Sequence, residues 1–277
     1  MQRLMIGTIC TAARVACVGF VLHPTPVTAQ ELAVRYHSSE SNRLVIHTLY
    51  GPLAITIEGT SQYTTRFAQP DSLIIRFEQL DVQQFCICGH VTVPTASLLL
   101  QPTILRIDRN GRTTVRSSPE GDDRGGMVTD PVMQFGGMFY RFPASLLEPR
   151  AEWDDSSTDS YAQARKGSRE RTTVTRRGHY HVERDTIVDA TPAWVVAVRE
   201  RVHVISHLAT VKNDVKGVET FDGEEVGLLI VAKDGLGRLY RTQHGTYEGV
   251  LNIERPSERP FAASATLYID ATFQRVP

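Results

Sequence analysis

Two cysteines separated by one residue are the first candidates for chemistry. They stand in the segment Phe85-Cys-Ile-Cys-Gly-His90. If this segment is a strand, Cys86 and Cys88 project from one face with Cα atoms roughly 7 Å apart, so a disulfide between them needs a kink or a turn. Three interpretations are open: a structural disulfide, a pair of reduced and inert thiols, or a redox or metal site that includes His90. Export to an oxidising compartment favours the disulfide.

Histidines at strand spacing are the second candidates. His179 and His181 share one face of a predicted strand, a spacing that metal sites in β-sheets use, and His203 and His207 share a face of a later strand. No pattern in the sequence brings the two pairs together, and both lie on faces that we assign to solvent. We therefore interpret them as exposed strand histidines and predict no metal and no other cofactor.

One basic stretch could bind an anion. It runs from Arg165 to Arg171 and continues at Arg176-Arg177. Because side chains alternate along a strand, Arg169, Arg171 and Arg177 fall on one face, where an anionic headgroup could bind. The alternative, which the sequence favours, is that these arginines bind no ligand. They then form a solvated face that keeps the sheet soluble and prevents its edges from pairing with other strands.

No complete catalytic constellation accompanies these residues. The sequence has no G-x-S-x-G, H-E-x-x-H or P-loop pattern. A metal- or thiol-dependent enzyme built on Cys86, Cys88 and His90 lacks a visible fourth ligand and a standard spacing. We therefore predict that the protein has no enzymatic activity and no catalytic residues.

The first 29 residues have the pattern of an export signal. Arg3 and Arg14 form a basic leader, an apolar run follows from Val15 to Leu22, and Val27-Thr28-Ala29 fits a peptidase site. The apolar run is much shorter than the roughly 20 residues of a membrane-spanning helix. The sequence therefore predicts cleavage near Ala29 and a periplasmic or secreted protein that starts at Gln30.

Charge and hydropathy limit the partners of the mature chain. Removal of the leader leaves 28 basic and 31 acidic residues, a formal charge of −3 against −1 for all 277 residues. This balance argues against nucleic acid as a partner. No later stretch is apolar enough to span a membrane as a helix, so no integral span is predicted in the mature chain.

A period of two dominates the chain from Glu31 onward, with β-branched and aromatic residues between turn signals. The short spacing of the predicted strands favours antiparallel meanders. Five strands are clearest between Leu32 and Leu80, and hairpins are expected at Thr103–Val115 and Leu229–Tyr240. The predicted strands are Leu32–His37, Arg43–Tyr50, Leu53–Glu58, Ser61–Phe67 and Ser72–Leu80.

The second half alternates more regularly. One face of the last strand carries Ala265, Leu267, Ile269, Ala271 and Phe273, which is typical of a sheet with one face on a core and one in water. Residues 226–232 are apolar on both faces, which indicates a central strand or one under a cover. We predict an N-terminal β half over residues 30–118, a linker or short lid helix over 119–138, and a C-terminal β half over 139–277.

Residues at the start of the second half carry a resemblance. An F-P strand end, a Leu-Leu-x-Pro step, a Trp before acids and the run Tyr-x-Val-Glu-x-Asp-Thr-x-Val resemble uncharacterised exported bacterial β proteins. In these, two meandering halves look like the open, curved sheet of periplasmic lipoprotein carriers. The matching residues are Phe142, Pro143, Pro149, Trp153, Tyr180, Val182, Glu183, Asp185, Thr186 and Val188. We expect Trp153 to be a packing anchor where the new sheet begins.

The resemblance implies a fold and a compartment more than an activity. We expect a mainly β protein in which antiparallel meanders form one or two strongly curved, half-barrel-like sheets with at most one or two short helices. Its expected role is to shelter a lipid or another apolar ligand in the curved sheet. The alternative is an envelope-associated interaction or structural module that holds a partner protein with its exposed sheet surface.

Overall fold

The computed structural model describes most of the chain after its first 32 residues. It describes residues 33–69, 72–87, 89–92, 95, 99, 102–107, 113–117, 148–165, 168–210, 214–233, 238–256 and 259–276. The expected export signal and the expected linker or lid helix over 119–138 lie outside these residues. In the described part, no helix is long and apolar enough to span a membrane.

In the residues that the structure describes, twelve β-strands form one antiparallel sheet. Both predicted halves contribute to it: the first supplies β1 to β6 and the second supplies β7 to β12. The strands are β1 (Val34–Thr48), β2 (Gly51–Gln69), β3 (Ser72–Cys86), β4 (Gly89–Thr92), β5 (Thr103–Ile107), β6 (Thr113–Ser117), β7 (Glu152–Arg165), β8 (Ser168–Val188), β9 (Thr191–Thr210), β10 (Lys216–Ala232), β11 (Arg238–Glu254) and β12 (Phe261–Val276).

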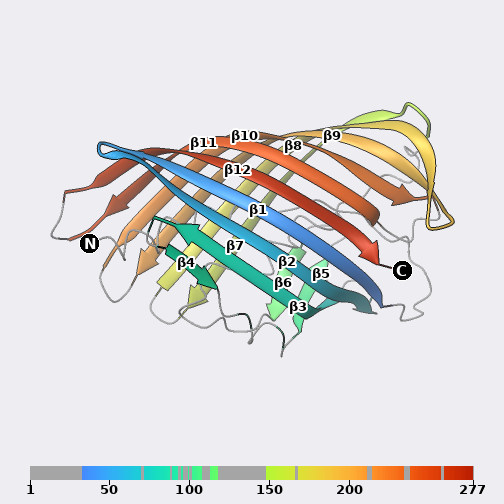
Figure 1. Ribbon diagram of the computed structural model, residues 1–277, viewed down its shortest axis with the longest axis horizontal. Helices are drawn as coiled ribbons and strands as arrows, with labels where there is room; N and C mark the ends of the chain where they lie inside the picture. The colour runs from blue at the N-terminus through green and yellow to red at the C-terminus, as the bar shows by residue number, and fades with distance from the viewer. Residues whose placement is uncertain are drawn as a thin grey trace.

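The pairing of β1 with β12 joins the two halves. The strand order is β6-β5-β3-β2-β1-β12-β11-β10-β9-β8-β7, and β4 pairs with β3 beside this path. Each half is a meander of neighbouring strands, and Leu44 of β1 lies opposite Leu267 of β12 at their junction. Figure 1 shows the result as one open, strongly curved sheet. This confirms the predicted fold class, with one sheet in place of one or two.

Two of the predicted strand divisions are wrong. The sequence placed breaks at residues 38–42 and at Glu58-Gly59, but β1 and β2 run through both. The polar residues there are part of the paired strands: Ser38 and Ser61 are buried, and their hydroxyl oxygens lie 2.7 Å apart. Polar side chains that hydrogen-bond each other across neighbouring strands do not interrupt a sheet.

The two predicted hairpins and the predicted apolar face of the last strand are confirmed. β5 pairs with β6 and β10 pairs with β11, although the turn residues of both hairpins lie outside the described residues. The predicted apolar face of β12 is buried from Ala265 to Phe273. β10 is an interior strand, as expected, but its outward Val226 and Leu228 are exposed, so that face has no cover over them.

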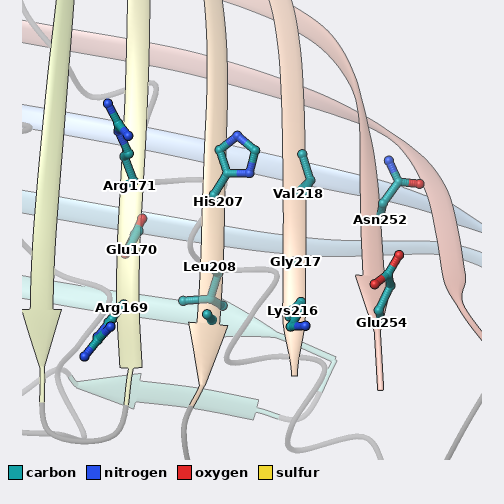
Figure 2. Close-up of a pocket in the computed structure, with 11 residues that line it drawn as sticks. Arg169, Glu170, Arg171, His207, Leu208, Lys216, Gly217, Val218, Asn252 and Glu254 are labelled. Carbon is teal, nitrogen blue, oxygen red and sulfur yellow. The ribbon is translucent and has the colours of Figure 1, made fainter. Parts of the chain in front are cut away.

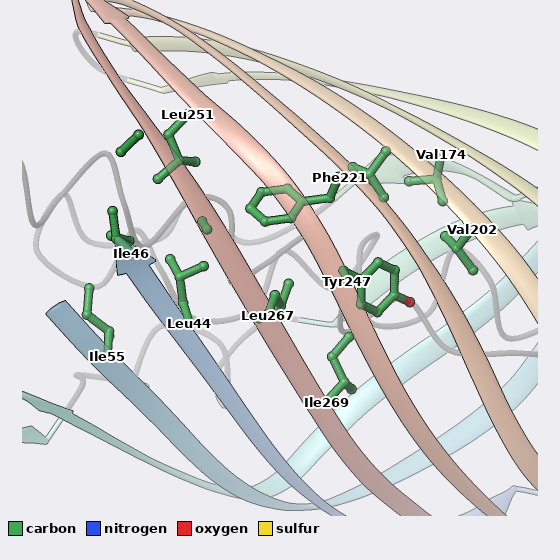
Figure 3. Close-up of a cluster of buried hydrophobic side chains, with 13 residues drawn as sticks. Leu44, Ile46, Ile55, Val174, Val202, Phe221, Tyr247, Leu251, Leu267 and Ile269 are labelled. Atoms are coloured by element: carbon green, nitrogen blue, oxygen red, sulfur yellow. The ribbon is translucent and has the colours of Figure 1, made fainter. Parts of the chain in front are cut away.

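The core lies along the inner face of the curve. A single row crosses seven strands from Ile55 in β2 through Leu44, Leu267, Tyr247, Gly223 and Val202 to Arg176 in β8. Figure 3 shows the apolar members of this region gathered on one face of the sheet. At the β7 side, Trp153 stacks on Tyr180 with ring centroids 5.1 Å apart, which confirms Trp153 as a packing anchor.

Glycines on the inner face make room for tyrosine rings. A Cβ atom on Gly223 would lie 2.5 Å from the ring of Tyr247, and one on Gly178 would lie 2.8 Å from the ring of Tyr180. Real Cβ atoms do not approach other atoms so closely, so each ring lies flat over a position that only glycine can occupy.

Candidate functional site

A groove of about 630 Å³ crosses one end of four neighbouring strands, β8 to β11. The strand register sets its lining. One row runs from Arg171 through His207 and Val218 to Asn252, and the next row outward begins at Arg169. Both rows lie on the face opposite the core, because their strand neighbours Thr172, Ser206 and Glu219 are buried. We call this site the basic groove.

Three cations line the basic groove. Arg169 and Arg171 come from β8 and Lys216 comes from β10, with His207 of β9 between them (Figure 2). Lys216 lies opposite Ala209 and Ala209 lies opposite Arg169, so the small alanine leaves space between the two charged side chains. The positive groups therefore surround one opening instead of spreading along the sheet.

Few acids oppose these cations. Glu254, opposite Lys216, is the acid that shares their face, while Glu170 follows Arg169 and so points to the other face. Among the residues that the structure describes, none forms an ion pair or a side-chain hydrogen bond with Arg169, Arg171 or Lys216. The groove thus has a net positive charge whose donors are available to a ligand.

The remaining lining is largely apolar. Val218 lies between His207 and Asn252, and Ala209 lies between Arg169 and Lys216, whereas Leu208 and Gly217 belong to the row of Glu170 on the other face. Guanidinium groups form paired hydrogen bonds to carboxylates and phosphates, and aliphatic side chains accept methylene groups. This arrangement suits a molecule with an anionic head joined to an apolar chain.

A second groove lies at the opposite end of the sheet. Its volume is about 400 Å³, and its lining includes Asp189, Tyr240 and Arg275. With one acid and one cation, it has no net charge to select a ligand. The basic groove is therefore the stronger candidate.

The inner face holds an ionisable cluster that the sequence analysis missed. Glu200 of β9 lies directly opposite Glu225 of β10, and both are fully buried. The Tyr180 hydroxyl donates to Glu200 Oε1 at 2.5 Å, and the Tyr247 hydroxyl donates to Glu225 Oε1. Arg176 Nε lies 3.7 Å from Glu200 Oε2. We call these five residues the buried cluster.

Burial controls the protonation of the buried cluster. Desolvation raises the pKa of Glu200 to about 8, although the nearby Arg176 guanidinium acts in the opposite direction. Desolvation likewise raises the pKa of Glu225. Burial first, and the neighbouring carboxylates second, raise the pKa of Tyr180 and of Tyr247 well above 10. At neutral pH the cluster therefore holds Glu200 mainly as the neutral acid.

The alternating pattern contains a signal for this cluster. Arg176 shares the face of Val174 and Tyr180, and Glu200 shares the face of Val198 and Val202. A charged residue on the apolar face of a strand is buried with that face, and a buried charge needs polar partners. The predicted face of Arg177 is confirmed, but Arg177 does not line the basic groove.

The predicted cysteine pair lies at a hairpin. β3 ends at Cys86, Ile87 is in the turn, and β4 begins at Gly89. Cys86 is disulfide-bonded. Cys88 lies outside the described residues, so the Cys86–Cys88 disulfide stays a prediction.

The predicted strand histidines lie beside single carboxylates. In the described part of the chain, no group of three or more His, Cys, Asp or Glu side chains is suited to hold a metal ion. Three histidines each contact their own carboxylate through Nδ1: His179 with Asp154 at 2.9 Å, His181 with Glu152 at 3.0 Å, and His203 with Asp222 at 2.7 Å. His179 is exposed, whereas His181 and His203 are half-buried beside their carboxylates. That these histidines bind no metal stays a prediction.

Comparisons with known proteins give no family. No family model matches the chain, and no curated protein matches it. Among solved structures, OccK2 (OpdF) of Pseudomonas aeruginosa shares 8% identity over 88% of this chain and 98% of its own, with a TM-score of 0.28. A DUF1329 family protein from Desulfovibrio piger shares 12% identity over 98% of this chain and 92% of its own, with a TM-score of 0.14. These TM-scores are too low to support a functional conclusion.

Proposed function

We propose that this protein is an exported, non-enzymatic binding protein for an amphiphile with an anionic head, such as an acidic lipid, and that the basic groove holds the head. The observation that carries the proposal is the convergence of Arg169, Arg171 and Lys216 on one groove with an apolar lining. The resemblance to periplasmic lipoprotein carriers agrees with this role. The leader before Gln30 supports export, which N-terminal sequencing of the protein from the culture would test.

Charge and shape favour an anionic head over a neutral one. A hydrogen bond to a charged group contributes about 1.5 to 3 kcal/mol, more than a neutral hydrogen bond. Arg169 and Arg171 each offer a planar donor group that matches a phosphate or carboxylate, while Lys216 adds a point charge from the other side. The apolar lining at Val218 and Ala209 would contact the first methylene groups of the ligand.

Calorimetric titration with short-chain lipids tests the proposal. Dihexanoyl phosphatidylglycerol, kept below its micelle concentration, should bind with higher affinity than dihexanoyl phosphatidylcholine, and added salt should weaken the binding. Arg171→Ala should lower the affinity about tenfold or more, since it removes a charge-assisted contact.

Arg199 provides the matched control. It is exposed on the outward face of β9 but lies outside the groove, so Arg199→Ala should bind like the wild type. Equal affinity of wild type and Arg171→Ala, or equal affinity for the two lipids, would contradict the proposed headgroup site.

A further inference from the structure

Two hairpin turns expose large apolar side chains at one end of the sheet. Leu49 and Tyr50 form the turn between β1 and β2 and are each 100% exposed. Ile87, in the turn between β3 and β4, is 79% exposed. Because β2 pairs directly with β3, the two turns lie at the same end of the sheet, and the β1–β2 turn projects farther, since Cys86 lies opposite Ile55 and not opposite Gly51. We call these three residues the apolar tips.

The turn of Leu49 and Tyr50 is built to hold its shape. The Tyr50 amide donates to Thr48 Oγ1 at 3.2 Å, and the Thr48 hydroxyl donates to the Gly51 carbonyl at 2.7 Å. Gly51 adopts a φ of 111°, a conformation that glycine accepts without strain. Backbone groups that are satisfied within a turn lower the cost of moving that turn out of water.

Charged residues avoid the apolar tips. Residues 46–57 and 82–105 contain no Asp, Glu, Lys or Arg. The exposed side chains around Ile87 are themselves apolar or neutral, among them Phe85 and Val91. Large exposed apolar groups with no charged neighbour along the chain favour an interaction surface.

The basic groove lies at this same end of the sheet. His47 of β1 pairs with Ser264, so β12 begins beside the apolar tips. The antiparallel register then places the end of β11 and the start of β10 at this end, where Lys216 faces Glu254. In Figure 1 this end is on the left, where the turn between β1 and β2 projects. One end of the sheet therefore carries the apolar tips at the turns after β1 and β3 and the groove cations on β8 and β10.

We propose that this end of the sheet docks on an anionic lipid bilayer, with Leu49 and Tyr50 inserted among the headgroups, Ile87 facing the bilayer behind them, and the basic groove facing the membrane charge. The proposal rests on the proposed function for the contribution of the groove, while the apolar tips support it independently. Tyrosine and leucine together suit the interfacial layer, because the phenol stays hydrated while apolar groups leave water. Cations near the surface add attraction to acidic lipids.

Area decides between a bilayer and a protein partner. A stable protein interface buries roughly 800 Å² on each partner and has a well-packed centre. Two narrow turns that project to different extents offer a few exposed side chains and no continuous surface. A bilayer requires only that these side chains enter it, so it is the better match.

Sedimentation with vesicles tests the proposal. The protein is purified as the expressing cell exports it, and its N-terminus is read by mass spectrometry. Wild type should sediment with vesicles of phosphatidylcholine and phosphatidylglycerol, and less with phosphatidylcholine alone. The double variant Leu49→Ser/Tyr50→Ser should bind about tenfold or more weakly, because it removes two exposed apolar groups.

Ile187→Ser is the matched control. Ile187 is 72% exposed but lies near the end of β8, at the opposite end of the sheet, so this variant should bind vesicles like the wild type. A Tyr50→Trp variant adds a test of depth, since brominated acyl chains should quench the new tryptophan. Unchanged binding by the double variant, or no quenching in Tyr50→Trp, would overturn the proposal in favour of a protein partner or no partner.

The titration with short-chain lipid separates the two proposals. If the double variant binds the soluble lipid like the wild type but not vesicles, both proposals are supported. If wild type binds the soluble lipid and ignores vesicles, membrane docking is wrong and the headgroup site stands. If vesicle binding depends on Leu49 and Tyr50 but the soluble lipid does not bind, docking stands and the headgroup site is wrong.

Discussion

The buried glutamates and the groove cations show how the surroundings of an ionisable side chain decide its role. Glu200 and Glu225 face each other inside the sheet, where burial favours the neutral acid over the carboxylate. Arg169 and Arg171 lie at the sheet end, where a ligand can reach them. We therefore assign the buried cluster to stability and the basic groove to binding.

The raised pKa of Glu200 makes stability depend on pH. Its folded-state pKa of about 8 lies above the ordinary 4.5, so between these values the folded state holds a proton that the unfolded state has lost. The stabilisation by this group is complete below pH 4.5 and is lost as the pH rises through 8. The free energy of unfolding should therefore fall across this window, by at most about 1.4 kcal/mol per pH unit for one proton.

Glu200→Gln should reduce this pH dependence, since glutamine remains neutral and keeps an oxygen that accepts from Tyr180. Urea unfolding from pH 5 to 9 measures it: relative to wild type, the variant should gain stability as the pH rises. A constant difference between the two proteins across this range would show that Glu200 does not titrate inside it.

Sequence reasoning succeeded for some residues and failed for others. Alternation alone placed Arg169 and Arg171 on one outward face, because a strand has two faces. It could not add Lys216, which β10 brings to the groove through a register that no local pattern encodes. The face of Glu200 was readable from the sequence, but its partner Glu225 was not, since partnership across strands depends on pairing.

At the scale of elements, glycine and tyrosine act together across neighbouring strands. Tyr247 of β11 lies opposite Gly223 of β10, and its ring covers that glycine. Such positions weaken a strand taken alone, because glycine loses more entropy on folding. The ring that packs there compensates, so these glycines do not end their strands. The Glu58-Gly59 step misled the sequence analysis for a related reason: glycine inside a paired strand looks like a turn.

Gly223→Ala should destabilise the protein by about 1 to 3 kcal/mol, because the added methyl group would overlap the Tyr247 ring and the Thr246 carbonyl. Gly59→Ala is the control, since its Cβ would meet its nearest atoms at 3.7 Å, an ordinary contact. It should change stability by less than about 1 kcal/mol. Thermal unfolding followed by circular dichroism would compare them, and equal loss in both would argue against the proposed ring packing.

At the scale of the whole molecule, the pairing of β1 with β12 makes two meanders one sheet. The sequence predicted the antiparallel meanders, because periods of two and short connections favour neighbouring pairs, and the resemblance to lipoprotein carriers implied the curvature. It left open whether the halves share a sheet, since β1 and β12 lie at opposite ends of the chain. The predicted boundary at residues 119–138 separates two segments of sequence but not two sheets.

A shared sheet should unfold as one unit. Leu44→Ala removes a fully buried side chain in β1 and should cost about 2 to 5 kcal/mol. The chain has two tryptophans, Trp153 and Trp194, and both lie in the second half. Their fluorescence should therefore report the Leu44→Ala destabilisation although the change is in the first half, whereas the exposed Arg43→Ala should have little effect. A tryptophan transition that ignores Leu44→Ala would show two independent units.

Native mass spectrometry of the exported protein tests whether the basic groove holds an anionic head. Wild type should be released with one bound anionic amphiphile, and Arg171→Glu/Lys216→Glu, which reverses two charges of the basic groove, should be released without it. Arg199→Glu, outside the groove, should retain the ligand. A wild-type protein that is free of any amphiphile, or a groove variant that retains the same ligand, would contradict the claim that this groove binds an anionic head.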